Sequence, residues 1–191
     1  MKHNFKNYQK HTHQRGFTLI EMAIVLMVIG VLAMASVYGF GVYRTTKNEA
    51  EARKINGIMS ALQNKWKFDP TTSTITNSTV NSAGILTGVQ WPITVSGTTV
   101  TILNPYSGAV TFAPGTITTA GDAFSLTYAN VPSGACSDIA RNVESNAYNI
   151  TIGATVVQST PSVQALGTAI DAACTAAAAQ SMILVYSKYP S

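Results

Sequence analysis

The sequence predicts an α+β fold in which one long N-terminal helix packs against an antiparallel β-sheet. Residues 22–43 carry no charge, and the apolar residues after them recur at helical spacing. Residues 71–130 contain 15 threonines and one charged residue, a composition that favours strands and turns. Beyond residue 130, short helical and strand patterns surround two cysteines.

The charges are unevenly distributed along the 191 residues. The 12 Lys and Arg exceed the 8 Asp and Glu, which gives a formal net charge of +4. Residues 1–16 hold four of the basic residues, all three histidines and no acid, so the eight basic residues after them balance eight acids. A chain without residues 1–16 would lack histidine, which excludes His-based triads and His metal sites. It would also lack a basic patch, so no nucleic-acid partner is predicted.

The charge-free run is long enough to cross a membrane. Its 22 residues would form a helix of about 33 Å, against a bilayer core of about 30 Å. The basic residues ahead of it place residues 1–16 in the cytoplasm and the C-terminus outside. Four basic residues after the run oppose this orientation weakly, because two glutamates lie among them.

The helix is predicted to continue beyond the run, over residues 17–67 in all. A single apolar stripe supports this second half. The stripe consists of Ala52, Ile55, Ile58, Met59, Leu62 and Trp66. Glu49 and Arg53 form a favourable i, i+4 pair, and Asp69-Pro70 ends the helix. Because only one face of this half is apolar, the remainder of the chain must cover it.

Turn residues and alternating apolar residues predict the elements up to residue 130. In order they are a polar loop over 71–81, a short turn over 83–86, a strand over 98–103, a turn over 104–108, a return strand over 109–113 and a third strand over 123–128. The aromatic and branched residues of these strands are expected to cover the long helix.

The elements after residue 130 are shorter. Ser133 is a candidate N-cap for a helix whose stripe is Cys136, Ile139, Ala140 and Val143. The further elements are one or two strands over 149–157, a helix over 163–173 and a final strand over 182–187. Residues 172–179 are ambiguous: their propensity favours a helix, whereas a resemblance to a known family implies a loop.

Three interpretations of the N-terminus compete. Ala33-Met34-Ala35 looks like the cleavage site of a secretory signal peptide, but a carboxylate at Glu21 is costly in such a segment. The second interpretation is a permanent membrane anchor. The third rests on Arg15-Gly16-Phe17-Thr18-Leu19-Ile20-Glu21, which resembles the cleavage site of type IV prepilins, directly ahead of a charge-free helix.

The resemblance implies a role for three residues. Prepilin peptidase would cut after Gly16 on the cytoplasmic side, and Phe17 would become an N-methylated N-terminus. Glu21 would pair with the α-amino group of Phe17 on a neighbouring subunit, because a carboxylate in an apolar bundle is costly unless it is paired. A leader of 16 residues resembles the type IVb branch, whereas Phe at the mature start is typical of type IVa.

Cys136 and Cys174 are too few and too far apart for a zinc site. On the oxidising, exported side of the membrane a disulfide is the default, and two free buried thiols are the alternative. Such a bridge resembles the C-terminal disulfide loop of pilins. The segment 124–136 looks like the type IVb major pilins of conjugative and enteric thin pili.

The resemblance therefore implies a type IV pilin fold with a C-terminal disulfide-bonded region. It divides the chain into a cleaved leader over 1–16, a transmembrane and assembly helix over 17–43, the amphipathic half of that helix over 44–69 and a globular head over 70–191. The precursor would sit in the inner membrane with its C-terminus in the periplasm, and the product in an extracellular filament.

The implied function is structural. The chain would polymerise with copies of itself after contacting the membrane, the prepilin peptidase and the inner-membrane assembly machinery, and the filament would serve adhesion, aggregation or conjugative mating. A minor pilin or a type II secretion pseudopilin is the alternative. No enzymatic activity, catalytic residue, cofactor or metal is predicted.

Overall fold

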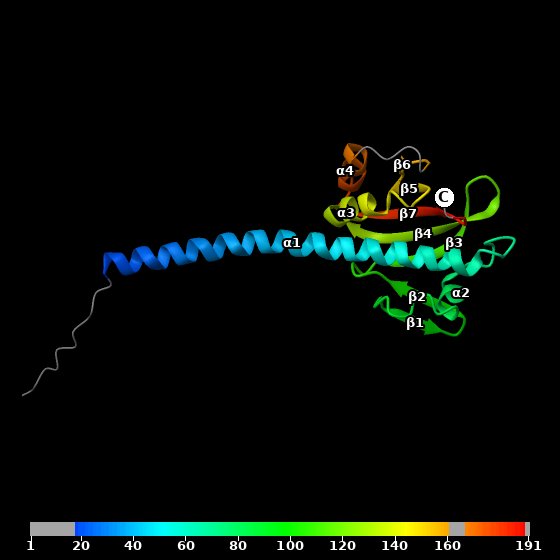
Figure 1. Ribbon diagram of the computed structural model, residues 1–191, viewed down its shortest axis with the longest axis horizontal. Coiled ribbons are helices and arrows are strands. Elements are labelled where there is room, and N and C mark those ends of the chain that lie inside the picture. Colours follow the sequence, from blue (N-terminus) through cyan, green and yellow to red (C-terminus); the bar gives the residue numbers. More distant parts are fainter. Residues whose placement is uncertain (1–17, 161–166, 190–191) are drawn as a thin grey trace, which may run out of the picture. The chain divides into compact units, whose positions relative to one another are not determined.

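The computed structural model describes residues 18–160 and 167–189. The chain forms two compact units, Met1–Val42 and Tyr43–Ser191. The helix α1, Leu19–Trp66, contributes to both, which confirms the predicted long helix (Figure 1). No residue of its segment Leu19–Ser36 is buried, and this is the one stretch of the described residues that is long and apolar enough to cross a membrane.

In the second unit, one face of α1 is buried. All six residues of the predicted stripe, from Ala52 to Trp66, are at most 7% exposed. The predicted pair of Glu49 and Arg53 forms with a distance of 3.3 Å between Oε2 and Nη2, and it is exposed. The helix ends at Trp66, whose carbonyl accepts a hydrogen bond from the amide of Asp69. The periodicity of the sequence therefore predicted the buried face, and Asp69-Pro70 predicted the end of this half.

A seven-stranded antiparallel sheet lies against α1 in the order β1-β2-β3-β4-β7-β5-β6. In Figure 1, β1 and β2 lie on one side of α1 and β5 and β6 on the other. The strands are β1 Ile93–Ser96, β2 Thr99–Leu103, β3 Ala109–Thr116, β4 Ala120–Pro132, β5 Asn149–Ile152, β6 Thr155–Gln158 and β7 Ala179–Ser187. The predicted strands are all present, and β1 is an addition that the sequence analysis did not identify.

The predicted turn over 104–108 joins β2 to β3. The Asn104 side chain accepts hydrogen bonds from the amides of Tyr106 and Gly108, each at 2.9 Å, and donates one to the carbonyl of Ala129 at 2.7 Å. A Cβ at Gly108 would lie 1.8 Å from the carbonyl oxygen of Ala129. Only glycine can therefore bring this turn so close to β4.

The prediction of a loop over residues 71–81 is wrong for its second half. A short helix, α2, spans Asn77–Ser82, and Thr76 and Thr79 form a capping box at its start. The Asn77 side chain donates to the carbonyls of Val100 and Val110 and accepts from the amide of Phe112. It thus bridges β2 and β3, which pair directly at only two positions.

Two further helices complete the core. They are α3, Ser133–Val143, and α4, Gly167–Thr175. Ser133 is not the N-cap that the sequence suggested: Pro132 holds that position without a side-chain cap, and Ser133 is the first helical residue. The predicted stripe of α3 is buried. The start of the predicted helix over 163–173 lies outside the described residues, and the ambiguous stretch divides into α4, a bend and β7.

The helices α1, α3 and α4 pack on one face of the sheet. Their buried side chains belong to a single core together with alternating strand residues such as Phe124, Leu126 and Tyr128. These three strand residues have no exposed surface, which confirms that they cover the helix as predicted. The fold is therefore two layers, one of helices and one of strands.

Candidate functional site

The first unit presents one acid on an apolar helix. Of residues 18–43, Glu21 is the single charged one. Its neighbours Leu19, Ile20 and Met22 are 91%, 71% and 53% exposed. The Glu21 amide binds the carbonyl and the hydroxyl of Thr18, so the carboxylate lies in the first turn of α1, where the helix dipole favours it.

The other two predicted residues of this site, Gly16 and Phe17, lie outside the described residues. Among the described residues, the Glu21 carboxylate contacts no basic side chain. The large apolar side chains around it lack a cover of the kind that the second unit gives its own stripe. A large apolar surface of this kind is unfavourable in water, and it marks a segment that a membrane or another helix covers.

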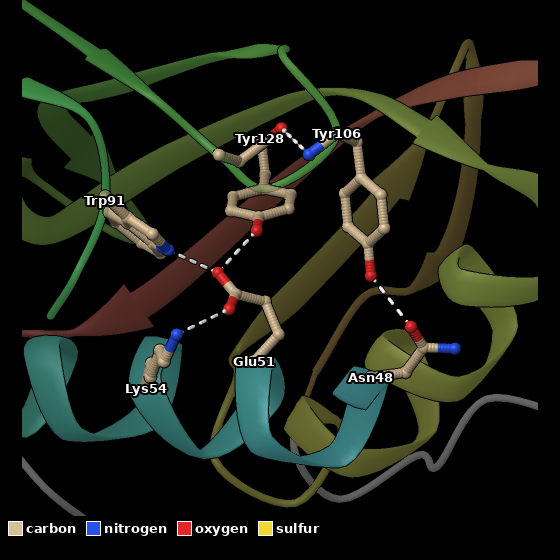
Figure 2. A network of polar contacts seen from close by, with 7 residues as sticks. Asn48, Glu51, Lys54, Trp91, Tyr106 and Tyr128 are labelled. Carbon is tan, nitrogen blue, oxygen red and sulfur yellow. Dashed lines mark hydrogen bonds and ion pairs between the residues drawn. The ribbon is translucent and has the colours of Figure 1, made fainter. Parts of the chain in front are cut away.

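A second glutamate of α1 is fully partnered. Glu51 is 3% exposed, and its carboxylate accepts hydrogen bonds from Trp91 Nε1 and from the Tyr128 hydroxyl, the latter at 2.7 Å (Figure 2). Lys54 Nζ lies 3.2 Å from the other oxygen. A buried carboxylate is stable only with such partners, so this cluster fixes α1 against β4 and the loop before β1.

The cluster continues along α1 toward the N-terminal end of the helix. The Tyr106 hydroxyl donates to Asn48 Oδ1 at 2.8 Å (Figure 2). Asn48 Nδ2 donates in turn to Asp138 of α3 at 2.8 Å. Burial, and after it the negative charge of Glu51, raises the pKa of both tyrosines, that of Tyr106 to about 12. Both phenols therefore remain protonated donors at any physiological pH.

Sequence analysis counted Glu51 only as one of the charges after the membrane span. A usable signal was present, because residues 51, 55, 58 and 62 share one helical face. Farther along α1, Asn56 donates to the carbonyl of Asn142 at 3.2 Å and Gln63 to that of Ser187 at 2.7 Å. Polar residues beside the stripe thus bind α1 to α3 and β7.

The two cysteines form a disulfide between α3 and α4. Cys136 and Cys174 are both fully buried, with their Cα atoms 5.7 Å apart. The bridge settles the choice between a disulfide and free thiols. Arg141 and Asp171 join the same helices with a 2.7 Å ion pair, and hydrogen bonds from Arg141 and Ser137 lower the pKa of Asp171.

Two family models match the chain. The first, the prokaryotic N-terminal methylation motif, covers residues 11–37, and the second, PilS N terminal, covers residues 45–187. The chain belongs to the type IV pilin family. The motif includes Gly16, Phe17 and Glu21, and the members of the family are structural subunits rather than enzymes.

Solved structures of pilins share the fold. A type IV b pilin from Salmonella typhi is 17% identical, with a TM-score of 0.57 over 72% of this chain and 97% of the other. TcpA, a type IV pilin from the Vibrio cholerae El Tor biotype, is 16% identical, with a TM-score of 0.53 over 74% and 99%. No curated protein sequence is significantly similar to this pilin.

Within residues 18–160 and 167–189, no group of three or more His, Cys, Asp or Glu side chains is placed to hold a metal ion. The described residues offer three chemically notable features: the carboxylate of Glu21, the disulfide and the cluster around Glu51. The first belongs to the exposed helix and the other two hold the head together.

Proposed function

We propose that this pilin is the major subunit of a type IVb pilus. The precursor lies in the inner membrane with residues 1–16 in the cytoplasm and the head in the periplasm. Prepilin peptidase cuts after Gly16, Phe17 is N-methylated, and the inner-membrane assembly machinery adds the mature chain to an extracellular filament. The observation that carries the proposal is the methylation motif over residues 11–37, which includes an exposed apolar helix segment with one carboxylate.

Glu21 directs the assembly step in this proposal. When a subunit leaves the membrane for the filament, its helix exchanges lipid for other helices, and the carboxylate must keep a partner. Cleavage creates an α-amino group at Phe17, four residues before Glu21. The amine of one subunit pairs with the carboxylate of its neighbour, and this pair sets the axial register between the two helices.

The division of the chain follows from these roles. Residues 17–43 anchor the precursor and then form the filament core, residues 44–69 join that helix to the head, and residues 70–191 form the head. Hydrogen bonds of Asn48, Glu51, Asn56 and Gln63 along the joining segment support this assignment, because they hold the helix and the head together.

The mass of the mature N-terminal peptide tests the proposal. We expect a chain that begins with N-methylated Phe17. A chain that begins at Ser36 would identify a secretory signal peptide, and an intact Met1 would identify a permanent anchor. Gly16→Glu is the matched variant: we expect full-length protein to accumulate in the membrane, and normal cleavage of this variant would contradict the assigned site.

Abundance separates a major pilin from a minor pilin or a secretion pseudopilin. Filaments sheared from cells should consist mainly of this chain, as shown by gel densitometry and peptide mass spectrometry. If the chain is a trace component of filaments built from another pilin, the assignment as major subunit is wrong. If cleaved chain remains in the envelope and forms no surface filament, a pseudopilin is the better assignment.

A further inference from the structure

The face of the sheet that turns away from α1 has an unusual composition. Asp122 is the single charged residue in the seven strands, and hydrogen bonds from residues 117–119 hold its carboxylate. Charged residues make up about a quarter of an ordinary soluble domain. A sheet face that serves only to meet water would therefore carry several.

Cross-strand pairing joins the residues of this face into two adjacent rows. One row, from β3 to β6, is Thr111, Thr127, Ile183, Thr151 and Val156. The other is Ala113, Ser125, Val185 and Asn149. We call these nine residues the outer rows. All are exposed or half-buried, and none is charged.

Residues of the outer rows alternate along their strands with core residues. Thr127 lies between Leu126 and Tyr128, and Ile183 lies between Met182 and Leu184, all four of which are fully buried. The core that includes α1, α3 and α4 contains no residue of the outer rows. The described helices therefore pack on the opposite face and leave these side chains uncovered.

We propose that the outer rows are the centre of a contact with the head of a second copy of this chain. The inference rests on the proposed function, because a homopolymer supplies identical heads in close proximity. An uncharged face does not repel a copy of the same chain and gives up little hydration when it is buried. Threonine, valine and isoleucine are stiff at χ1 and short, so ordering them costs less entropy than ordering lysine or glutamate.

The size of the outer rows fits this role. A standard interface involves about 20–30 residues on each side, so nine residues would form its centre and the surrounding polar residues its rim. The helical side of the head is less suited, because it carries the exposed Arg53 and the Arg141–Asp171 pair. A partner docked there would have to desolvate these charges.

The test introduces one charge into the rows of the full-length chain, expressed in cells that assemble the pilus. Thr127→Lys should reduce the yield of sheared filaments about tenfold or more, because the ammonium group would be buried at the contact without a partner. Thr127→Val keeps the shape and stays uncharged, and should assemble normally. Thr168→Lys makes the same exchange at an exposed position of α4 and should also assemble.

Two measurements separate assembly from folding. Membrane levels of the cleaved chain and formation of the Cys136–Cys174 disulfide, seen as gel mobility without reductant, should match the wild type in all three variants. A photo-reactive benzoylphenylalanine at Thr127 should cross-link two copies of the chain in sheared filaments. Normal assembly of Thr127→Lys, or cross-links only to a different protein, would overturn the inference.

The result for the wild-type chain distinguishes failure of the proposed function from failure of the proposed contact surface. If the wild type forms filaments and Thr127→Lys assembles equally well, the proposed function stands and the contact surface is wrong. If the wild type forms no filament in the presence of the assembly machinery, the proposed function fails and this inference fails with it.

Discussion

The two glutamates of α1 have opposite environments on one helix. Glu51 lies in the second unit, buried, with a tryptophan, a tyrosine and a lysine around its carboxylate. Glu21 lies in the first unit, among exposed apolar side chains, and contacts no basic side chain in the part of the chain that the structure describes. The first acid is satisfied by folding, whereas the described residues supply no cation to the second.

This difference distinguishes a residue that stabilises the folded head from a residue proposed to act in filament assembly. A buried acid with three partners stabilises the folded head, and its loss should reduce the free energy of unfolding. An acid that folding leaves without a partner contributes little to that free energy. In the proposed assembly step its energetic effect appears only when another subunit supplies a cation, so substitutions at the two positions should have separable phenotypes.

The largest effect is expected for Glu21→Ala. Cleavage and the folded head should remain intact, because no contact of the head involves Glu21 among the described residues, while surface filaments should be lost or greatly reduced. Immunoblots of sheared filaments and of membranes measure the two quantities side by side. Normal filament yield from this variant would show that assembly does not depend on the Glu21 carboxylate. The proposed contrast between Glu21 and Glu51 would then be wrong.

Glu51→Ala should show the reverse pattern. It leaves the Trp91 and Tyr128 donors buried without an acceptor, which should cost about 3 kcal/mol of unfolding free energy. Denaturant unfolding of the purified full-length chain in detergent, followed by tryptophan fluorescence, measures the loss. Glu51→Gln is the control: it retains one acceptor oxygen and should lose less. Equal losses in both variants would assign the effect to the Lys54 ion pair instead.

Removal of the disulfide tests whether cleavage of the leader is independent of the stability of the head. The double variant Cys136→Ser, Cys174→Ser should lower the unfolding free energy by roughly 3–4 kcal/mol, because the open chain gains conformational freedom. Cleavage after Gly16 should be unchanged, as the mass of the N-terminal peptide would show. If cleavage stopped in this variant, processing would depend on the folded head, and the two units would not act separately.

The smallest effect is expected for Arg53→Ala. Its ion pair with Glu49 is exposed, with Arg53 79% accessible, so solvent screens the attraction and the change should be below about 0.5 kcal/mol. The same unfolding measurement at low and high salt checks this. A loss similar to that of Glu51→Ala would show that the exposed face of α1 also contributes to holding the head.

Periodic features of this chain were predictable and local polar contacts were not. The charge-free run and the stripe from Ala52 to Trp66 gave α1 and its buried face, because one apolar face leaves a strong repeat in the sequence. The strands of the hairpin around Asn104 were likewise identified. β1 was missed because its four residues, Ile93–Ser96, are too few to show alternation and three of them are exposed.

Contacts between distant residues explain two of the other errors, those at α2 and Glu51. The helix α2 forms in a Thr- and Asn-rich segment because Thr76 and Thr79 cap it and Asn77 binds β2 and β3, which lie far along the chain. Ser133 has the residue type of an N-cap, but Pro132 occupies that position. The role of Glu51 depended on Trp91 and Tyr128, 40 and 77 residues away, and a single sequence does not show such pairs.

The disulfide has a mechanical consequence for a subunit under load. Cys136 and Cys174 are 38 positions apart, and the covalent bridge closes the segment between them, which includes β5 and β6. If a pulling force unfolded the head, this segment would contribute no extension, whereas an open chain of that length would add about 125 Å. The bridge therefore shortens the distance over which a stretched head could lengthen before its covalent backbone bears the tension.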